Sequence, residues 1–167
     1  MTSATTAFEA SGVSAQNLLN DDQVADFVIN GYHIVEPQFP AEFHSQIYSD
    51  LEVLPTNPGD EINKAVPNID EIYEHPAVRG ALSSLLGADY SRAAHRHCHR
   101  NHPGTRSQVW HQDSLNIPTL DDGHGRVSDH VQSVLVMYYP QDVASNMGPT
   151  ALIPGSHLFT ASGDRNA

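Results

Sequence analysis

Cysteine is nearly absent, because Cys98 is the only one among 167 residues. A single thiol excludes both an intramolecular disulfide framework and a four-cysteine zinc site. Long apolar runs are also missing, since no uninterrupted stretch approaches the ~20 residues that a membrane-spanning helix needs. Residues 1–14 lack the basic start and the apolar segment of a secretory signal. We therefore expect a cytoplasmic protein without a membrane span.

Basic residues are scarce as well. Lys and Arg together number 8 against 20 Asp and Glu, which gives a formal net charge of −12. Phosphate backbones and anionic membranes attract proteins of the opposite sign, so we expect neither nucleic acid nor membrane surfaces as partners. Hydrophobic residues make up 39% of the chain, and this share is enough to bury the core of one domain.

The chain divides into a tail and one domain. Residues 1–17 are rich in Ser, Thr and Ala and are predicted to form a flexible tail, followed by a domain over residues 18–167. Apolar residues at helical spacing predict helices up to about residue 87, and residues 88–160 favour β-structure. Helices followed by strands predict an α+β fold, with the helices packed outside a sheet or barrel.

Capping and breaking residues set the boundaries of three predicted helices. They run from Asn20 or Asp21 to Gly31, from Pro40 to Pro55, and from Pro76 to Gly87. Gly80 lies inside the third predicted helix, where glycine lowers helix stability by ~1 kcal/mol relative to alanine and so weakens the prediction. Residues 55–70 hold three prolines and are predicted to be a loop. Predicted strands lie near residues 90–99, 107–113, 130–139 and 150–153.

The strongest local motif is Trp-His-Gln-Asp at residues 110–113. Side chains two apart on a strand point to one face, so His111 and Asp113 can hold two adjacent positions around a metal ion. Two histidines and one carboxylate on one face of iron leave three positions for a bidentate co-substrate and dioxygen. From these two residues alone, a hydrogen-bonded His–Asp pair at a strand end stays an open alternative.

Two further stretches accompany this motif: Met-Tyr-Tyr-Pro-Gln-Asp-Val at residues 137–143 and Gly-Pro-Thr-Ala-Leu-Ile-Pro-Gly-Ser-His at residues 148–157. Taken together, the three segments resemble the phytanoyl-CoA dioxygenase family of iron(II)/2-oxoglutarate oxygenases. The helix that starts with His-Pro-Ala-Val at residues 75–78 is also similar to that family. The resemblance runs from about residue 18 to residue 160 and implies a double-stranded β-helix, the cupin-like jelly roll, carrying N-terminal helices.

The resemblance also implies a site. His111 and Asp113 stand where the family has its first two iron(II) ligands. Gln108 and Thr150 match positions from which some relatives contact the co-substrate 2-oxoglutarate. A sheet-edge amide remains the alternative for Gln108, and a strand-forming β-branched residue remains the alternative for Thr150.

The family pattern then breaks off. Its second iron-binding histidine and the arginine that pairs with 2-oxoglutarate lie well downstream of the Pro-Gly-Ser-His turn, whereas the sequence ends ten residues after His157, at Ala167. We assign His157 a structural role in the turn rather than a metal bond. The resemblance therefore implies a jelly roll that is incomplete at its C-terminus, with its third iron ligand unassigned.

Histidine is abundant, with 11 residues, and three of them alternate with other residues at 95, 97 and 99. On a strand they share one face about 6–7 Å apart. One alternative function follows, a zinc-dependent hydrolase using His97 and His99, although no third ligand or acidic base is spaced for it. If the chain is an oxygenase, this face either lines the pocket or is a solvated, partly cationic strand face.

The sequence thus predicts a non-haem dioxygenase that hydroxylates a small metabolite or acyl ester with Fe(II), 2-oxoglutarate and O2. The 167 residues by themselves are expected to be inactive, for want of the distal histidine and arginine. A non-catalytic truncated remnant is the alternative from a different functional class. A small molecule is the expected partner, and the sequence leaves the oligomeric state open.

Overall fold

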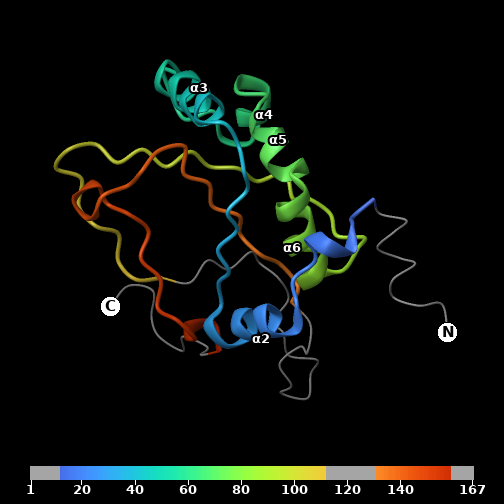
Figure 1. Cartoon of the computed structure of the whole chain (residues 1–167). Coiled ribbons are helices and arrows are strands. Elements are labelled where there is room, and N and C mark those ends of the chain that lie inside the picture. Colours follow the sequence, from blue (N-terminus) through green and yellow to red (C-terminus); the bar gives the residue numbers. More distant parts are fainter. Residues whose placement is uncertain (1–11, 112–130, 159–167) are drawn as a thin grey trace.

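The computed structural model describes residues 12–111 and 131–158, and Figure 1 shows how their helices are arranged. In chain order the helices are η1 (Ala15–Asn17), α2 (Asp21–Asn30), α3 (Ala41–Glu52), η2 (Gly59–Glu61), α4 (Ile62–Ala65), α5 (Ile69–Glu74), α6 (Pro76–Leu86), η3 (Ser145–Met147) and η4 (Ser156–Leu158). No helix among the described residues has the length and apolar character needed to cross a membrane. The extended segment between α2 and α3 places these two helices at opposite ends of the molecule in Figure 1.

Helix α2 confirms the first predicted helix at both ends. The Asn20 side chain accepts a hydrogen bond from the Gln23 N–H at 2.9 Å, and the Gln23 side chain accepts one from the Asn20 N–H at 3.0 Å. This reciprocal capping box satisfies two backbone donors that the first turn of a helix leaves unpaired. The helix stops at Gly31, whose φ of 82° lies in the left-handed region that glycine adopts without strain.

Helix α3 supplies the main apolar core. It follows Pro40, as predicted, and ends at Glu52, three residues before Pro55. Ile47 is fully buried, and it packs with residues of α4, α5 and the link between them. The buried cluster consists of Ile47, Ile62, Val66, Ile69 and Ile72. Three of its members come from the stretch between residues 55 and 70 that the sequence predicted to be a loop.

That loop prediction was wrong in part, because η2, α4 and the first two residues of α5 lie within residues 55–70. Each of these helices is at most six residues long. Such short helices are marginal in isolation and depend on the burial of their apolar side chains. One turn also carries too few apolar positions for helical spacing to be visible in the sequence.

Helix α6 confirms the third predicted helix and explains its internal glycine. A Cβ atom on Gly80 would lie 1.8 Å from the backbone oxygen of Asn17, so only glycine allows η1 to approach this closely. The Ser84 hydroxyl accepts a hydrogen bond from the Leu19 N–H at 2.9 Å and fixes the same contact. Val13 is only 6% exposed. Residues 12–17, which the sequence assigned to the tail, therefore include a segment packed on α6.

Strand-like alternation is visible in the later segments, although no β-strand is present in residues 12–111 and 131–158. Over residues 134–139, exposed positions alternate with half-buried ones. Leu135, Met137 and Tyr139 are exposed, whereas Tyr138 packs against the core cluster. A strand requires a hydrogen-bonded neighbour, and residues 112–130, which hold part of the predicted sheet, lie outside the described residues. The jelly roll thus stays a prediction.

Candidate functional site

His111 is held in one tautomer by the backbone beside it. Its Nδ1 lies 2.8 Å from the carbonyl oxygen of Val109. A carbonyl oxygen only accepts hydrogen bonds, so Nδ1 carries the proton, and Nε2 of the neutral ring carries the lone pair. Metal-binding histidines are oriented in this way, by donating the second ring N–H to a carbonyl or carboxylate. This orientation would suit a metal ligand, and metal binding by His111 stays a prediction.

Asp113, the second predicted ligand, lies outside the described residues. Within residues 12–111 and 131–158, no three His, Cys, Asp or Glu side chains are grouped so that they could hold a metal ion. The pairing of His111 with Asp113 accordingly stays a prediction. The predicted alternative of a zinc hydrolase gains no third ligand from the part of the chain that the structure describes.

The two predicted co-substrate residues, Gln108 and Thr150, are both exposed. The turn before Thr150 is anchored, because the Asn101 side-chain amide donates a hydrogen bond to the Gly148 carbonyl at 2.8 Å. Gly148 has φ 72°, and a Cβ atom there would lie 2.8 Å from the same amide nitrogen of Asn101. The start of the Gly-Pro-Thr segment is thus fixed to the end of the histidine-rich segment, which leads toward His111.

The Pro-Gly-Ser-His turn docks on the end of α2 (Figure 1). The Gly155 N–H donates to the Asn30 carbonyl at 2.9 Å, and His157 Nε2 donates to the Val28 carbonyl at 2.9 Å. Both carbonyls lie in the last turn of α2, where helix geometry leaves the backbone oxygens unpaired. His157 therefore has the structural role that the sequence suggested, although its partner is a distant helix rather than the local backbone.

The histidine-rich segment has two different faces. His95, His97 and His99 are exposed, whereas the residues between them are partly buried. The three imidazoles therefore lie on one face, as the predicted strand required. Of the two interpretations left open by the sequence, the described residues fit the solvated face. The intervening residues, Arg96, Cys98 and Arg100, turn toward the helices.

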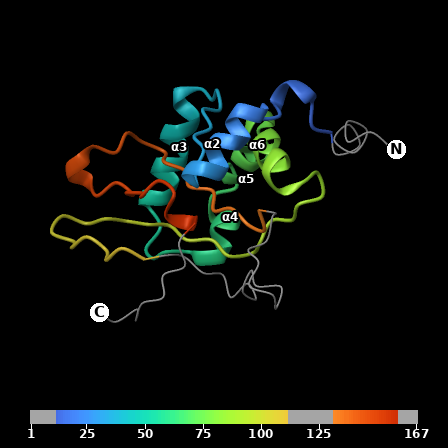
Figure 2. The same ribbon diagram turned by 90° about the horizontal axis from the view of Figure 1, so that it is seen from below.

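Two side chains join this segment to the end of α3, and Figure 2 shows the segment running beside α4. The Arg100 guanidinium donates hydrogen bonds to the Leu54 carbonyl at 2.9 Å and to the Leu51 carbonyl. The Asn57 side chain donates to the Cys98 carbonyl at 2.9 Å and accepts from the Cys98 N–H at 3.4 Å. An asparagine amide thus pairs with both backbone groups of one residue, as a neighbouring strand would.

His44 and Tyr138 connect α3 to the segment that precedes the Pro-Gln-Asp motif. His44 Nδ1 and the Tyr138 hydroxyl are 2.8 Å apart and partly buried, and their rings are stacked with centroids 5.9 Å apart. Burial raises the pKa of the Tyr138 hydroxyl from 10.0 to about 12, because an apolar environment disfavours the phenolate. The helical layer is therefore fastened to residues 134–139 by this hydrogen bond and ring contact.

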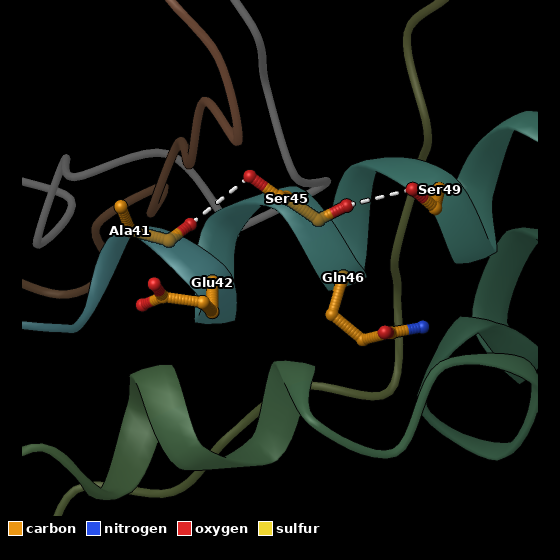
Figure 3. A pocket seen from close by; sticks show the side chains of 5 residues that line it. All are labelled: Ala41, Glu42, Ser45, Gln46 and Ser49. Atoms are coloured by element: carbon orange, nitrogen blue, oxygen red, sulfur yellow. Dashed lines mark hydrogen bonds between the residues drawn. The ribbon is translucent and has the colours of Figure 1, made fainter.

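A hollow on the surface of α3 is not a candidate site. Its lining residues are Ala41, Glu42, Ser45, Gln46 and Ser49 (Figure 3). All five come from one helix, and the two serine hydroxyls donate to backbone carbonyls one turn earlier, at 3.1 and 2.9 Å. Side chains from a single helical face do not converge on a ligand, so this hollow offers no constellation for chemistry.

Sequence reasoning found His111 but missed the groups that position the segments around it. The Val109 carbonyl has no side-chain signature. Arg100, Asn57 and Tyr138 form hydrogen bonds with groups that lie between 41 and 94 positions away in the chain. The one available signal was the alternation of the histidine-rich segment, which placed Arg100 on the face opposite the histidines.

Comparison with protein families gives one match. The family model described as Phytanoyl-CoA dioxygenase (PhyH) matches residues 13–162. This range includes the Trp-His-Gln-Asp motif and the Pro-Gly-Ser-His turn. It also includes every described helix, from η1 to η4. Neither the curated proteins nor the solved structures gave a match.

Proposed function

The chain belongs to the phytanoyl-CoA dioxygenase family. On this basis we propose that it is part of a non-haem iron(II)/2-oxoglutarate-dependent hydroxylase. The proposed substrate is a small metabolite or acyl ester. The family supports a dioxygenase-type enzyme. In the proposed reaction, a substrate C–H bond, 2-oxoglutarate and O2 are converted to a hydroxylated product, succinate and carbon dioxide.

The orientation of His111 is the observation that carries this proposal. A histidine binds iron only through an unprotonated nitrogen. The Val109 carbonyl fixes the proton on Nδ1, which supports Nε2 as the nitrogen that would bind iron.

The residues of this chain would hold the cofactor and co-substrate in distinct ways. We propose His111 and Asp113 as iron ligands, and we propose that Gln108 and Thr150 donate hydrogen bonds to 2-oxoglutarate. Iron(II), when bound with 2-oxoglutarate and O2, supplies the oxidising power for the C–H bond. The anchoring of Gly148 by Asn101 sets the direction in which the chain enters Thr150.

A jelly roll is the fold that we propose for this function. Its support is the alternation of exposed and half-buried residues over 134–139, with one face against the helical core and the other carrying exposed apolar side chains. Leu135 is 68% exposed and Ile153 is 52% exposed. Large apolar side chains on an extended segment are normally covered by a second sheet, which a double-stranded β-helix supplies.

Anaerobic binding of labelled 2-oxoglutarate to the 167-residue chain tests the proposal. We expect binding that requires Fe(II), because the co-acid is to be held through the metal. We also expect no succinate when O2 is admitted, since the proposed set has only two protein ligands and lacks the arginine for the distal carboxylate. Binding that is independent of Fe(II) would overturn the proposed role of the metal.

Succinate release by this chain would change the ligand assignment. It would require another metal ligand within the 167 residues, and a histidine from the 95–99 segment would be the first to examine. His157 is a weaker candidate, because its Nε2 is engaged by the Val28 carbonyl.

A further inference from the structure

The Gly-Pro-Thr segment is held at both of its ends. At its start, the Asn101 side-chain amide donates a hydrogen bond to the Gly148 carbonyl at 2.8 Å. At its far end, the Gly155 N–H donates to the Asn30 carbonyl at 2.9 Å. Thr150, which we propose as a contact for 2-oxoglutarate, lies between these two anchors. Its position therefore depends on groups that have no role of their own in the proposed chemistry.

Asn101 and Gly148 are fitted to each other. Gly148 has φ 72°, in the left-handed region that glycine adopts without strain. A Cβ atom at this position would lie 2.8 Å from the amide nitrogen of Asn101. A side chain at 148 would thus strain the backbone and displace the amide. The hydrogen bond accordingly requires glycine on one side and a short side-chain donor on the other.

Little freedom remains between the held carbonyl and Thr150. The Gly148 carbonyl belongs to the planar peptide group that ends at the Cα atom of Pro149. The proline ring fixes φ of Pro149 near −65°. Rotation about ψ of Pro149 is then the one soft dihedral that moves the Cα atom of Thr150 relative to this peptide group. Fixing the carbonyl therefore restricts where Thr150 can lie.

Asn101 also directly precedes a tight turn. The Thr105 N–H donates to the His102 carbonyl at 3.0 Å, and the glycine at the third position of this turn has φ 83°. Proline at the second position and a left-handed glycine at the third give such a turn a defined shape. Gln108, the other proposed co-substrate contact, follows Thr105 by three positions. The Asn101 amide thus joins the start of the Thr150 segment to the turn that leads to Gln108.

We propose that Asn101 is a positioning residue for 2-oxoglutarate binding, whose amide sets where the Thr150 hydroxyl lies relative to Gln108. The inference rests on the proposed function, and Asn101 itself touches neither the co-substrate nor the metal in this proposal. Asn101 is exposed and is not a member of the buried core cluster, so its substitution leaves the helical core intact.

Anaerobic equilibrium dialysis of 2-oxoglutarate with the 167-residue chain and Fe(II) tests the proposal. Asn101→Ala removes the amide, and Asn101→Leu keeps the branched shape of the side chain without its donor. Each should weaken 2-oxoglutarate binding about three- to tenfold, as expected for one neutral hydrogen bond. In a Thr150→Ala background the same substitutions should have no further effect, because the group that Asn101 positions is already gone.

Asn57→Ala is the matched control. It removes another asparagine amide that bonds to a backbone carbonyl of a distant segment, that of Cys98 at 2.9 Å. This variant should keep the 2-oxoglutarate affinity of the parent. Fe(II) binding without 2-oxoglutarate should also be the same in Asn101→Ala as in the parent, a result that a general loss of structure would not give.

Three results would overturn the inference while the parent still binds 2-oxoglutarate in an Fe(II)-dependent way. They are an unchanged affinity in Asn101→Ala, an equal loss with and without Thr150→Ala, and an equal loss in Asn57→Ala. An unaffected Thr150→Ala variant also overturns it, since no contact is then left to position. A parent without Fe(II)-dependent binding would instead overturn the proposed function, and this inference with it.

Discussion

His157 Nε2 donates a hydrogen bond to the carbonyl oxygen of Val28, 2.9 Å away and 129 positions earlier in the chain. The imidazole lies against Gly31, where a Cβ atom would be 2.4 Å from Nδ1 of His157. The Pro-Gly-Ser-His turn thus closes the end of α2, and Gly31 is required both for its left-handed φ and for the room that it leaves to the ring.

We predict that Gly31→Ala lowers the free energy of unfolding through two separable effects. The left-handed backbone costs alanine about 1–2 kcal/mol, and the contact with the His157 ring adds to this. In a His157→Ala background only the backbone cost should remain. A double-mutant cycle followed by urea unfolding measures the difference. Equal costs of Gly31→Ala in both backgrounds would contradict the contact.

For Gly80→Ala, we predict the sign of the change in the free energy of unfolding. On helix propensity alone, alanine would stabilise α6 by about 1 kcal/mol. The added Cβ would lie 1.8 Å from the Asn17 backbone oxygen, so we expect a net loss of about 1–3 kcal/mol instead. In a chain that begins at Leu18 the obstacle is gone, and the same substitution should become stabilising. Thermal unfolding of the four chains decides between the two signs.

The raised pKa of Tyr138 predicts a stability that depends on pH in the alkaline range. The hydroxyl titrates at about 12 in the folded protein against 10.0 for the ordinary group. Above pH 10 the unfolded chain therefore loses this proton more readily than the folded one, and stability declines until about pH 12. Tyr138→Phe should remove this part of the decline in urea unfolding. Tyr139→Phe, which alters the neighbouring exposed ring, should preserve it.

The three longer helices were predictable because their signals are local. Asn20 with Gln23 and Gly31 mark the ends of α2, and Pro76 with Gly87 mark those of α6. The helical turns between residues 59 and 70 were not predictable, since their stability comes from burying Ile62 and Val66 under α3. Propensity decides the first case and tertiary packing decides the second.

The candidate site was predictable only in part, for a similar reason. The alternation of residues 95–100 placed three histidines on one face, and the structure agrees. The ring centroids of His97 and His99 are 4.4 Å apart, which is closer than the spacing of a regular strand. The Asn57 side chain contacts both His97 and the Cys98 backbone in the same segment. Contacts between residues 40 positions apart leave no pattern in a single sequence.

The co-substrate residues give a prediction about affinity. Gln108→Ala and Thr150→Ala each remove one proposed hydrogen bond to a carboxylate. Such bonds are worth roughly 1.5–3 kcal/mol, so 2-oxoglutarate should bind about ten- to a hundredfold more weakly in the presence of Fe(II). Anaerobic equilibrium dialysis measures this affinity. Unchanged binding in both variants would remove these two residues from the proposed site.

Manganese binding tests the proposed metal pair most directly. Mn(II) favours oxygen-rich sites and discriminates against a bare histidine pair, and free Mn(II) is counted by its paramagnetic resonance signal. We predict that 2-oxoglutarate increases Mn(II) uptake by the 167-residue chain, that His111→Ala and Asp113→Ala each abolish the increase, and that His102→Ala retains it. An increase that survives in either of the first two variants would contradict His111 and Asp113 as the metal ligands.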